Sequence, residues 1–282
     1  LLGLVGSEMC IRDRIMTQEN ARGIKAKKNI RIRQISTDQV WQWLAAAWKD
    51  IQRAPAQSLF FGASLTLLSM LVSAGLIISG TYYLLAPLLA GFLLVAPFIG
   101  IGLYSLSQQR ERGEDPDLKT ACFAWTSNSF QLLSMGLVLL VFFLLWAVLA
   151  WLIFFFFHDG PIPSDWEGYL SVVLGSWAGL QILAVGTYVG GMLAILVFTL
   201  SAVSIPMLMD RPVNVVVAIR TSWATVVSNV VPMLLWGGIL VTLIFAGFIT
   251  AYLGFIIGFP LAAHGTWHAY RGLVITGDHK LQ

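Results

Sequence analysis

Charged side chains are scarce in this 282-residue sequence. Asp, Glu, Lys and Arg together make up 11% of the residues, whereas 57% are hydrophobic, and the mean hydropathy is +0.79. Soluble proteins average about 25% charged residues, so this composition excludes an ordinary soluble domain and indicates a protein of the lipid bilayer. The net charge of +3 at pH 7 is too small to indicate a nucleic-acid partner.

Cysteine and histidine are also rare, with two Cys and four His in the chain. Cys10 lies in an opening stretch that we interpret as foreign to the protein, and Cys122 alone cannot form an internal disulfide framework or a Cys-based metal site. The sequence also lacks Ser/His/Asp groupings, Gly-rich phosphate loops and deaminase signatures. We therefore expect a non-enzymatic protein without a cofactor.

The opening stretch LVGSEMCIRDR, at positions 4 to 14, matches nothing else in the chain. It corresponds to the translation of an adapter used in transposase-based sequencing libraries. We therefore interpret residues 1–15 as translated adapter and Met16 as the natural first residue. Residues 16–36 then form a basic segment that we expect in the cytoplasm, without a cleavable signal peptide.

Long apolar runs predict six membrane-spanning helices, because about 20 apolar residues cross a hydrocarbon core of about 30 Å. The predicted spans cover residues 56–79, 82–106, 130–157, 179–205, 230–250 and 252–269. The expected fold is thus an all-α polytopic membrane helical bundle over residues 37–272, followed by a tail at 273–282. A short apolar stretch between the third and fourth spans is expected to be interfacial or re-entrant.

Basic residues occupy only one side of this predicted bundle. The loops on the opposite side carry no Lys or Arg, and their charged residues are Asp159, Asp165 and Glu167. Because basic loops stay in the cytoplasm, we expect both termini on the cytoplasmic side of a bacterial inner membrane. The six spans contain no Asp, Glu, Lys or Arg, which argues against ion-coupled transport.

A Trp-bearing amphipathic stretch precedes each odd-numbered span. The three stretches are residues 36–55 with Trp41, Trp43 and Trp48, residues 116–129 with Trp125, and residues 214–229 with Trp223. Trp favours the headgroup region, and a polar stripe opposite an apolar face is typical of helices that lie in the membrane surface. We therefore expect three cytoplasmic interfacial helices.

The even-numbered spans each carry a Pro towards their cytoplasmic ends, at Pro97, Pro206 and Pro260. In the second and sixth spans a Gly-Phe pair begins six residues before the Pro, at Gly91 and Gly254. An internal duplication would explain this similarity. Independent requirements for helix kinks and close packing would explain it equally well.

Four stretches of the chain resemble a known family. They are IRQISTDQVWQWLAAAWKDIQRAP, PLLAGFLLVAPFIGIGLYSLSQQRERGE, SIPMLMDRPVNVVVAIRTSWATVVSN and GFPLAAHGTWHAYRG. In this order they are similar to the bacterial integral-membrane family known as domain of unknown function number 2189, over residues 30–272. The activity of that family is not established, so the resemblance implies a polytopic membrane protein and nothing more specific.

Some members of that family are labelled as cytochrome c oxidase subunits, and the histidine count argues against this label here. A haem-copper core needs more His ligands than the four in this chain. His264 and His268 are the two that fall in or near the sixth span. Spaced i, i+4, they share one helical face and cannot hold a haem from both sides.

His264 and His268 could share a metal ion, although no third ligand is identifiable from the sequence. Alternatively, they mark the point where the sixth span leaves the bilayer, with His268, Trp267, Tyr270 and Arg271 among the headgroups. We favour this second interpretation. It predicts that no metal binds and that replacing both His by Gln leaves folding nearly unchanged.

The function favoured by the sequence is that of a non-enzymatic accessory or assembly partner, with the lipid bilayer and a membrane protein or a second copy as its partners. A passive or weakly coupled transporter of a small solute is the first alternative, and a metal-binding membrane enzyme is the second. A filled core with an exposed apolar seam would favour a partner protein. A water-filled cavity lined by the kinked even-numbered spans would favour transport.

Overall fold

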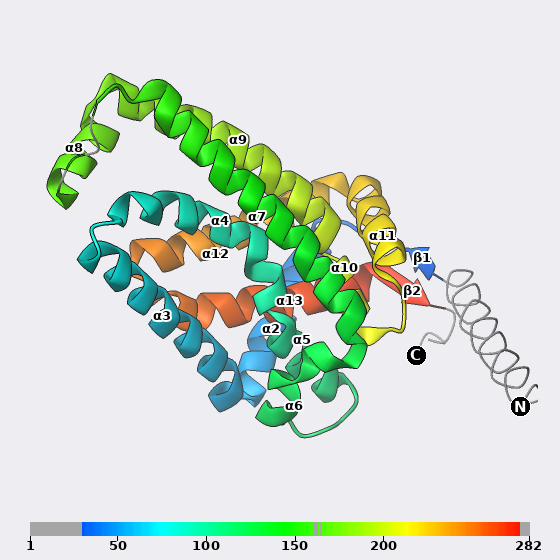
Figure 1. Ribbon diagram of the computed structural model, residues 1–282. Coiled ribbons are helices and arrows are strands. Elements are labelled where there is room, and N and C mark those ends of the chain that lie inside the picture. Colours follow the sequence, from blue (N-terminus) through cyan, green and yellow to red (C-terminus); the bar gives the residue numbers. More distant parts are fainter. Residues whose placement is uncertain (1–29, 161–162, 164, 277–282) are drawn as a thin grey trace, which may run out of the picture.

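The computed structural model describes residues 30–160, 163 and 165–276, which fold as a bundle of helices (Figure 1). The adapter stretch 1–15, residues 16–29 of the basic segment and residues 277–282 of the tail lie outside the described residues. Strands within the described range are β1 (Ile30–Ile32) and β2 (Val274–Thr276), which pair antiparallel. The predicted all-α membrane bundle is confirmed, and the small sheet holds the two ends of the described chain together.

The helices follow the predicted spans and the stretches between them. In chain order they are α2 (Asp38–Arg53), α3 (Pro55–Ile78), the 3₁₀ helix η1 (Tyr82–Leu84), α4 (Leu85–Ile99), α5 (Ile101–Glu111), α6 (Leu118–Cys122), the 3₁₀ helix η2 (Ala124–Asn128), α7 (Ser129–Phe157), α8 (Trp166–Gly175), α9 (Trp177–Ser201), α10 (Ser204–Asp210), α11 (Val215–Ser228), α12 (Val230–Ile249) and α13 (Phe255–Leu273).

Five helical segments of the described chain are long and apolar enough to cross a membrane. They are Pro55–Ile78, Tyr82–Glu111, Ala124–Phe157, Trp177–Asp210 and Val230–Ile249. These segments correspond to the first five predicted spans. The sixth predicted span exists as the 19-residue helix α13, but α13 is not one of the five, so the count of six remains a prediction.

Helix α13 is the most enclosed long helix, with 13 of its 19 residues buried. It runs through the middle of the molecule and contacts α2, α3, α5 and α12 (Figure 1). Helix α7 is the opposite case, because only four of its 29 residues are buried. Protein therefore surrounds α13, whereas most of the surface of α7 is available to lipid.

The first amphipathic stretch forms α2, and its apolar face packs on protein. Val40, Ala47 and Ile51 are buried, and α13 is the main neighbour of this helix. Trp41 and Trp48 are exposed as expected for headgroup contact, but the same prediction for Trp43 is wrong. The Trp43 ring is buried edge-on against the Trp236 ring of α12, with 5.9 Å between ring centroids.

The second amphipathic stretch is not a single helix, because it divides into α6 and η2. The hydroxyls of Thr126 and Ser127 donate to the carbonyls of Phe123 and Ala124, three residues earlier, and such local bonds compete with an α-helical ladder. Trp125 is exposed beside them.

The third stretch forms α11, whose polar side faces inward. Thr221, Ser222 and Thr225 are buried, while Val216 and Trp223 are exposed. In a soluble protein the apolar side chains of such a helix would face the core and its polar side chains would face the solvent. The inverted arrangement fits a helix whose outer face meets lipid.

The Gly and Pro pattern shared by the second and sixth spans leads to different structures. The second span breaks at Gly100, three residues after Pro97, whereas α13 continues through Pro260. Gly91 lies mid-helix, where an added Cβ would be 2.6 Å from the Phe143 ring. Gly254 instead precedes α13, in the tight turn that follows α12.

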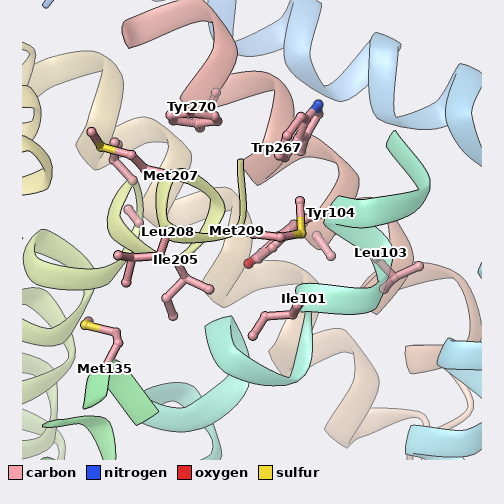
Figure 2. Close-up of a cluster of buried hydrophobic side chains, with 14 of the residues drawn as sticks. Ile101, Leu103, Tyr104, Met135, Ile205, Met207, Leu208, Met209, Trp267 and Tyr270 are labelled. Atoms are coloured by element: carbon pink, nitrogen blue, oxygen red, sulfur yellow. The ribbon is translucent and has the colours of Figure 1, made fainter. Parts of the chain in front are cut away.

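The fourth span is also broken, at residues 202–203 between α9 and α10. Pro206 lies in the first turn of α10, where a missing N–H is tolerated. The second halves of the two broken spans, α5 and α10, meet α13 in the main apolar core (Figure 2). The residues labelled there are Ile101, Leu103, Tyr104, Met135, Ile205, Met207, Leu208, Met209, Trp267 and Tyr270.

Candidate functional site: a buried polar cluster on helix α13

Four helices bring polar side chains together beside this apolar core. We call the group the Asp50 cluster, and its members are Asp50 from α2, Ser58 from α3, Ser107 and Arg110 from α5, and His264 and His268 from α13. Asp50 is 3% exposed and His264 is 1% exposed. Ionisable groups buried in a membrane protein are costly, and they commonly mark functional sites.

Helical spacing explains how the cluster assembles. In α2, Trp43, Ala47 and Asp50 follow one another at intervals of four and three residues, so Asp50 lies on the apolar face that packs on α13. His264 and His268 share one face of α13 through their i, i+4 spacing. The cluster therefore forms where the buried stripe of α2 crosses the histidine face of α13.

Hydrogen bonds hold both ring nitrogens of His264. Nε2 lies 3.0 Å from Ser58 Oγ, and Nδ1 lies 2.7 Å from Ser107 Oγ. The hydroxyl of Ser107 donates its one proton to Asp50 Oδ2 over 2.5 Å. The Ser107 oxygen must therefore accept from Nδ1–H of His264, which leaves Nε2 to accept from Ser58. On this assignment His264 is neutral.

Asp50 is the centre of the cluster because each of its carboxylate oxygens has a partner. Oδ1 forms an ion pair with the guanidinium of Arg110. Oδ2 accepts from Ser107 and lies 2.9 Å from His268 Nε2. A buried carboxylate with a cation and additional hydrogen-bond donors meets the conditions under which a charge is tolerated away from water.

A second polar group lies further along α13, and we call it the Asp210 cluster. Its members are Gln108, Glu111, Asp210, Arg211, Tyr270 and Arg271. The Tyr270 hydroxyl donates to Asp210 Oδ2 over 2.6 Å and accepts from Arg211 Nε over 2.7 Å. Because Arg110 and Glu111 are neighbours on α5, the two clusters form one continuous polar region.

The structure corrects the predicted surroundings of the histidine pair. Trp267 and Tyr270 were expected among lipid headgroups, and this is wrong, since both are 0% exposed. The side chains of His268 and Arg271 are partly exposed, at 19% and 24%. The physical reason is that α2 and α10 cover this end of α13, so that the helix ends among protein side chains.

Sequence reasoning missed Asp50, the acidic neighbour of both histidines. The available signal was a carboxylate on the otherwise apolar face of residues 36–55. Even so, among the residues that the structure describes, no group of three His, Cys, Asp or Glu side chains could hold a metal ion. Arg110 on Asp50 Oδ1 would also repel a metal cation placed there.

Part of the chain matches a known protein family. Residues 84–210 match the family described as "Predicted integral membrane protein (DUF2189)". Over these residues the chain is similar to that family. The match confirms the family resemblance and covers α4 to α10, and with them Ser107, Arg110 and Asp210. The other main members of the Asp50 cluster, on α2, α3 and α13, lie outside the DUF2189 match. No curated protein and no solved structure matches the chain.

Proposed function

We propose that this DUF2189 protein is a non-enzymatic accessory or assembly partner of a bacterial inner membrane. The proposal rests on one observation, namely that apolar side chains fill the core where α5 and α10, the second halves of the two broken spans, meet α13. In transporters, broken helices leave backbone groups free to bind the transported substrate. Here side chains of the protein occupy the equivalent positions.

Side-chain hydroxyl groups form hydrogen bonds with backbone groups at both breaks. The Tyr104 hydroxyl donates to the carbonyl of Pro97 over 3.2 Å. At the second break, Ser222 Oγ donates to the carbonyl of Thr199 over 2.8 Å and accepts from the N–H of Val203 over 3.2 Å. These bonds occupy the carbonyls of Pro97 and Thr199 and the N–H of Val203, so these three groups are not free to bind a solute.

Apolar side chains fill the space between the broken halves. Ile205, Met207 and Leu208 of α10 are 0% exposed and point among the side chains of α5, α7 and α13 (Figure 2). By contrast, Val231, Phe245 and Ile249 of α12 are exposed. A filled core with an exposed apolar face favours a partner helix over a transported solute.

The Asp50 cluster brings Ser58, His264 and an acid together, but not in the arrangement of a serine hydrolase, because Nδ1 of His264 donates to Ser107 and lies 3.7 Å from Asp50 Oδ2. Ser58 is 0% exposed, so a substrate carbonyl cannot reach its hydroxyl. The side chains of the cluster instead satisfy one another. This argues for a structural lock between α2, α3, α5 and α13 rather than for catalysis.

Photocrosslinking in native membranes tests the proposed role. A photoreactive residue in place of Phe245 should give a defined adduct with one membrane protein or with a second copy of the chain, identified by mass spectrometry. The same residue in place of the buried Leu273 is the matched control and should give no intermolecular adduct. Adducts with lipid alone at every exposed position of α12 would contradict a role as a partner protein.

Passive transport of a small neutral solute remains the alternative, and one observation favours it. Ser201 Oγ, beside the break in the fourth span, is buried without a hydrogen-bond partner among the described residues. Shrinkage assays on proteoliposomes with urea or glycerol would detect such a pathway. Permeability above that of protein-free vesicles, lost in Ser201→Val, would replace the accessory role with transport.

A further inference from the structure

A cavity of about 590 Å³ opens between α5, α6, η2 and α10. Its lining combines two cationic side chains, several hydroxyls and one exposed aromatic ring. The lining residues are Ser105, Gln108, Arg112, Lys119, Thr120, Phe123, Ala124, Thr126, Ser127 and Met209. No acidic residue is among them, so the chemistry of the lining suits an anion with several oxygen acceptors.

The two cations are available to a ligand. Neither Arg112 nor Lys119 has an ion pair within 4 Å among the described residues, whereas Arg110, Arg211 and Arg271 each face a carboxylate. This difference separates the cavity from the two clusters on α13.

Asp117, two residues before Lys119 in the chain, is committed to a helix cap. Asp117 caps α6 and accepts from the backbone N–H groups of Lys119 and Thr120 and from the Thr120 hydroxyl. These hydrogen bonds, with that of the Thr120 hydroxyl first, lower the pKa of the Asp117 carboxyl. Asp117 therefore stays ionised as a helix cap and partly offsets the cationic charge near Lys119 without entering the cavity lining.

A second, apolar cavity of about 200 Å³ is also lined in part by the α6–η2 segment. It is lined by Phe61, Phe98, Ile99, Ile101, Gly102, Ala121, Cys122 and Trp125. On α5, Ile101 and Gly102 line this apolar cavity, and Ser105 and Gln108 line the polar one. These positions are one helical turn apart on the same face of α5, so the lining changes from apolar to polar towards the end of the helix.

The change from an apolar to a polar lining matches a phospholipid at a membrane surface, whose acyl chains lie towards the apolar interior and whose phosphate lies towards the water. The polar cavity adjoins the loop between the second and third spans, on the side that the basic residues predict to be cytoplasmic. Basic pockets between membrane helices on that side bind lipid headgroups. The exposed ring of Phe123 lines the polar cavity and that of Trp125 lines the apolar one, and aromatic side chains favour the membrane interface.

We propose that the polar cavity binds the phosphate group of an anionic phospholipid. Arg112 and Lys119 contact the phosphate oxygens, and an acyl chain follows the apolar cavity along α5. A free phosphate offers the same oxygen chemistry but has no use for the apolar cavity. The two sources can therefore be separated by experiment.

Native mass spectrometry of the purified full chain tests the site. Phosphatidylglycerol should bind more tightly than phosphatidylcholine, and Arg112→Gln/Lys119→Gln should weaken phosphatidylglycerol binding about tenfold or more. The matched control is Lys49→Gln/Arg53→Gln, which removes the same charge from exposed positions of α2 and should leave binding unchanged. Arg112→Lys/Lys119→Arg keeps the charge and should retain binding, which guards against a loss caused by misfolding.

Two further arms separate lipid from free phosphate. Cys122→Phe fills the apolar cavity and should weaken binding of phosphatidylglycerol, and millimolar inorganic phosphate should not displace the lipid. Competition by inorganic phosphate with unchanged binding in Cys122→Phe would overturn the lipid assignment in favour of a soluble phosphate. Equal affinity for both lipids, or equal losses in the cavity and α2 variants, would overturn the site itself.

Discussion

Asp50 shows how one side chain can link three helices, because it joins α2 to α5 and α13. A buried ion pair is weak evidence for net stability, because removing two charges from water costs about as much as their attraction returns. Breaking such a pair is different, because one charge is left without its partner. The ion pair with Arg110 and the bond from Ser107 therefore predict a large effect of removing the Asp50 carboxylate.

Asp50→Ala should lower the free energy of unfolding by about 3 kcal/mol, the lower end of the range for broken buried pairs, because the Arg110 side chain remains 23% exposed. Asp38→Ala is the matched control, since Asp38 is an exposed acid in the first turn of the same helix. The control should change stability by less than about 0.5 kcal/mol. Denaturant unfolding in detergent measures both, and equal effects would show that the pair is not a lock.

The two histidines should respond differently to substitution, contrary to the expectation from sequence that Gln can replace both. His264 bridges Ser58 and Ser107 and is 1% exposed, so His264→Gln should cost about 1–3 kcal/mol through unsatisfied buried hydroxyls. His268 is partly exposed, and His268→Gln should cost less. Thermal unfolding of the two variants compares them, and a larger loss for His268→Gln would contradict the bridging geometry.

The sequence predicted those features of the site that depend on residues close together in the chain, and it missed those that depend on distant residues. The i, i+4 spacing placed His264 and His268 on one face because spacing along a helix is local. The contact with Asp50 joins residues more than 200 positions apart, and such a contact depends on how α2 and α13 cross. A pattern in one helix carries no information about that crossing.

Likewise, the amphipathic stretches predicted the presence of helices better than they predicted what those helices pack against. The pattern in residues 36–55 predicted α2, yet its apolar face meets α13 instead of lipid. In α11 the stripe containing Thr221 and Thr225 was recognised, but its burial was not. In a membrane protein both faces of a helix can be covered by apolar material, so hydrophobicity alone does not tell lipid from protein.

The break in the fourth span gives a prediction for a single hydroxyl. Ser222→Ala removes the group that joins Thr199 and Val203, and it should lower stability by about 1–3 kcal/mol because buried backbone groups lose their partner. Ser228→Ala, at the exposed end of the same helix, should be nearly neutral. Hydrogen exchange at the Val203 amide should be faster only in Ser222→Ala, and unchanged exchange would contradict this account of the break.

At the scale of the whole molecule, the two-stranded sheet constrains the number of membrane crossings. Ile30 pairs with Thr276, so the two ends of the described chain lie on the same side of a membrane. Figure 1 shows this sheet and α8 at opposite ends of the molecule. A chain whose ends share one side must cross an even number of times. Five candidate spans therefore require α13 as the sixth, or require that one of the five does not cross.

Labelling of single cysteines with a membrane-impermeant maleimide distinguishes these arrangements. In a background with Cys10→Ser and Cys122→Ser, the six-span model predicts outside labelling for Asp159→Cys and for Leu253→Cys, which lies between α12 and α13. Arg31→Cys and Glu114→Cys should be labelled only after the membrane is opened, because basic flanks stay in the cytoplasm. If α13 does not cross, Leu253→Cys will behave like Arg31→Cys, since no membrane separates the start of α13 from β2.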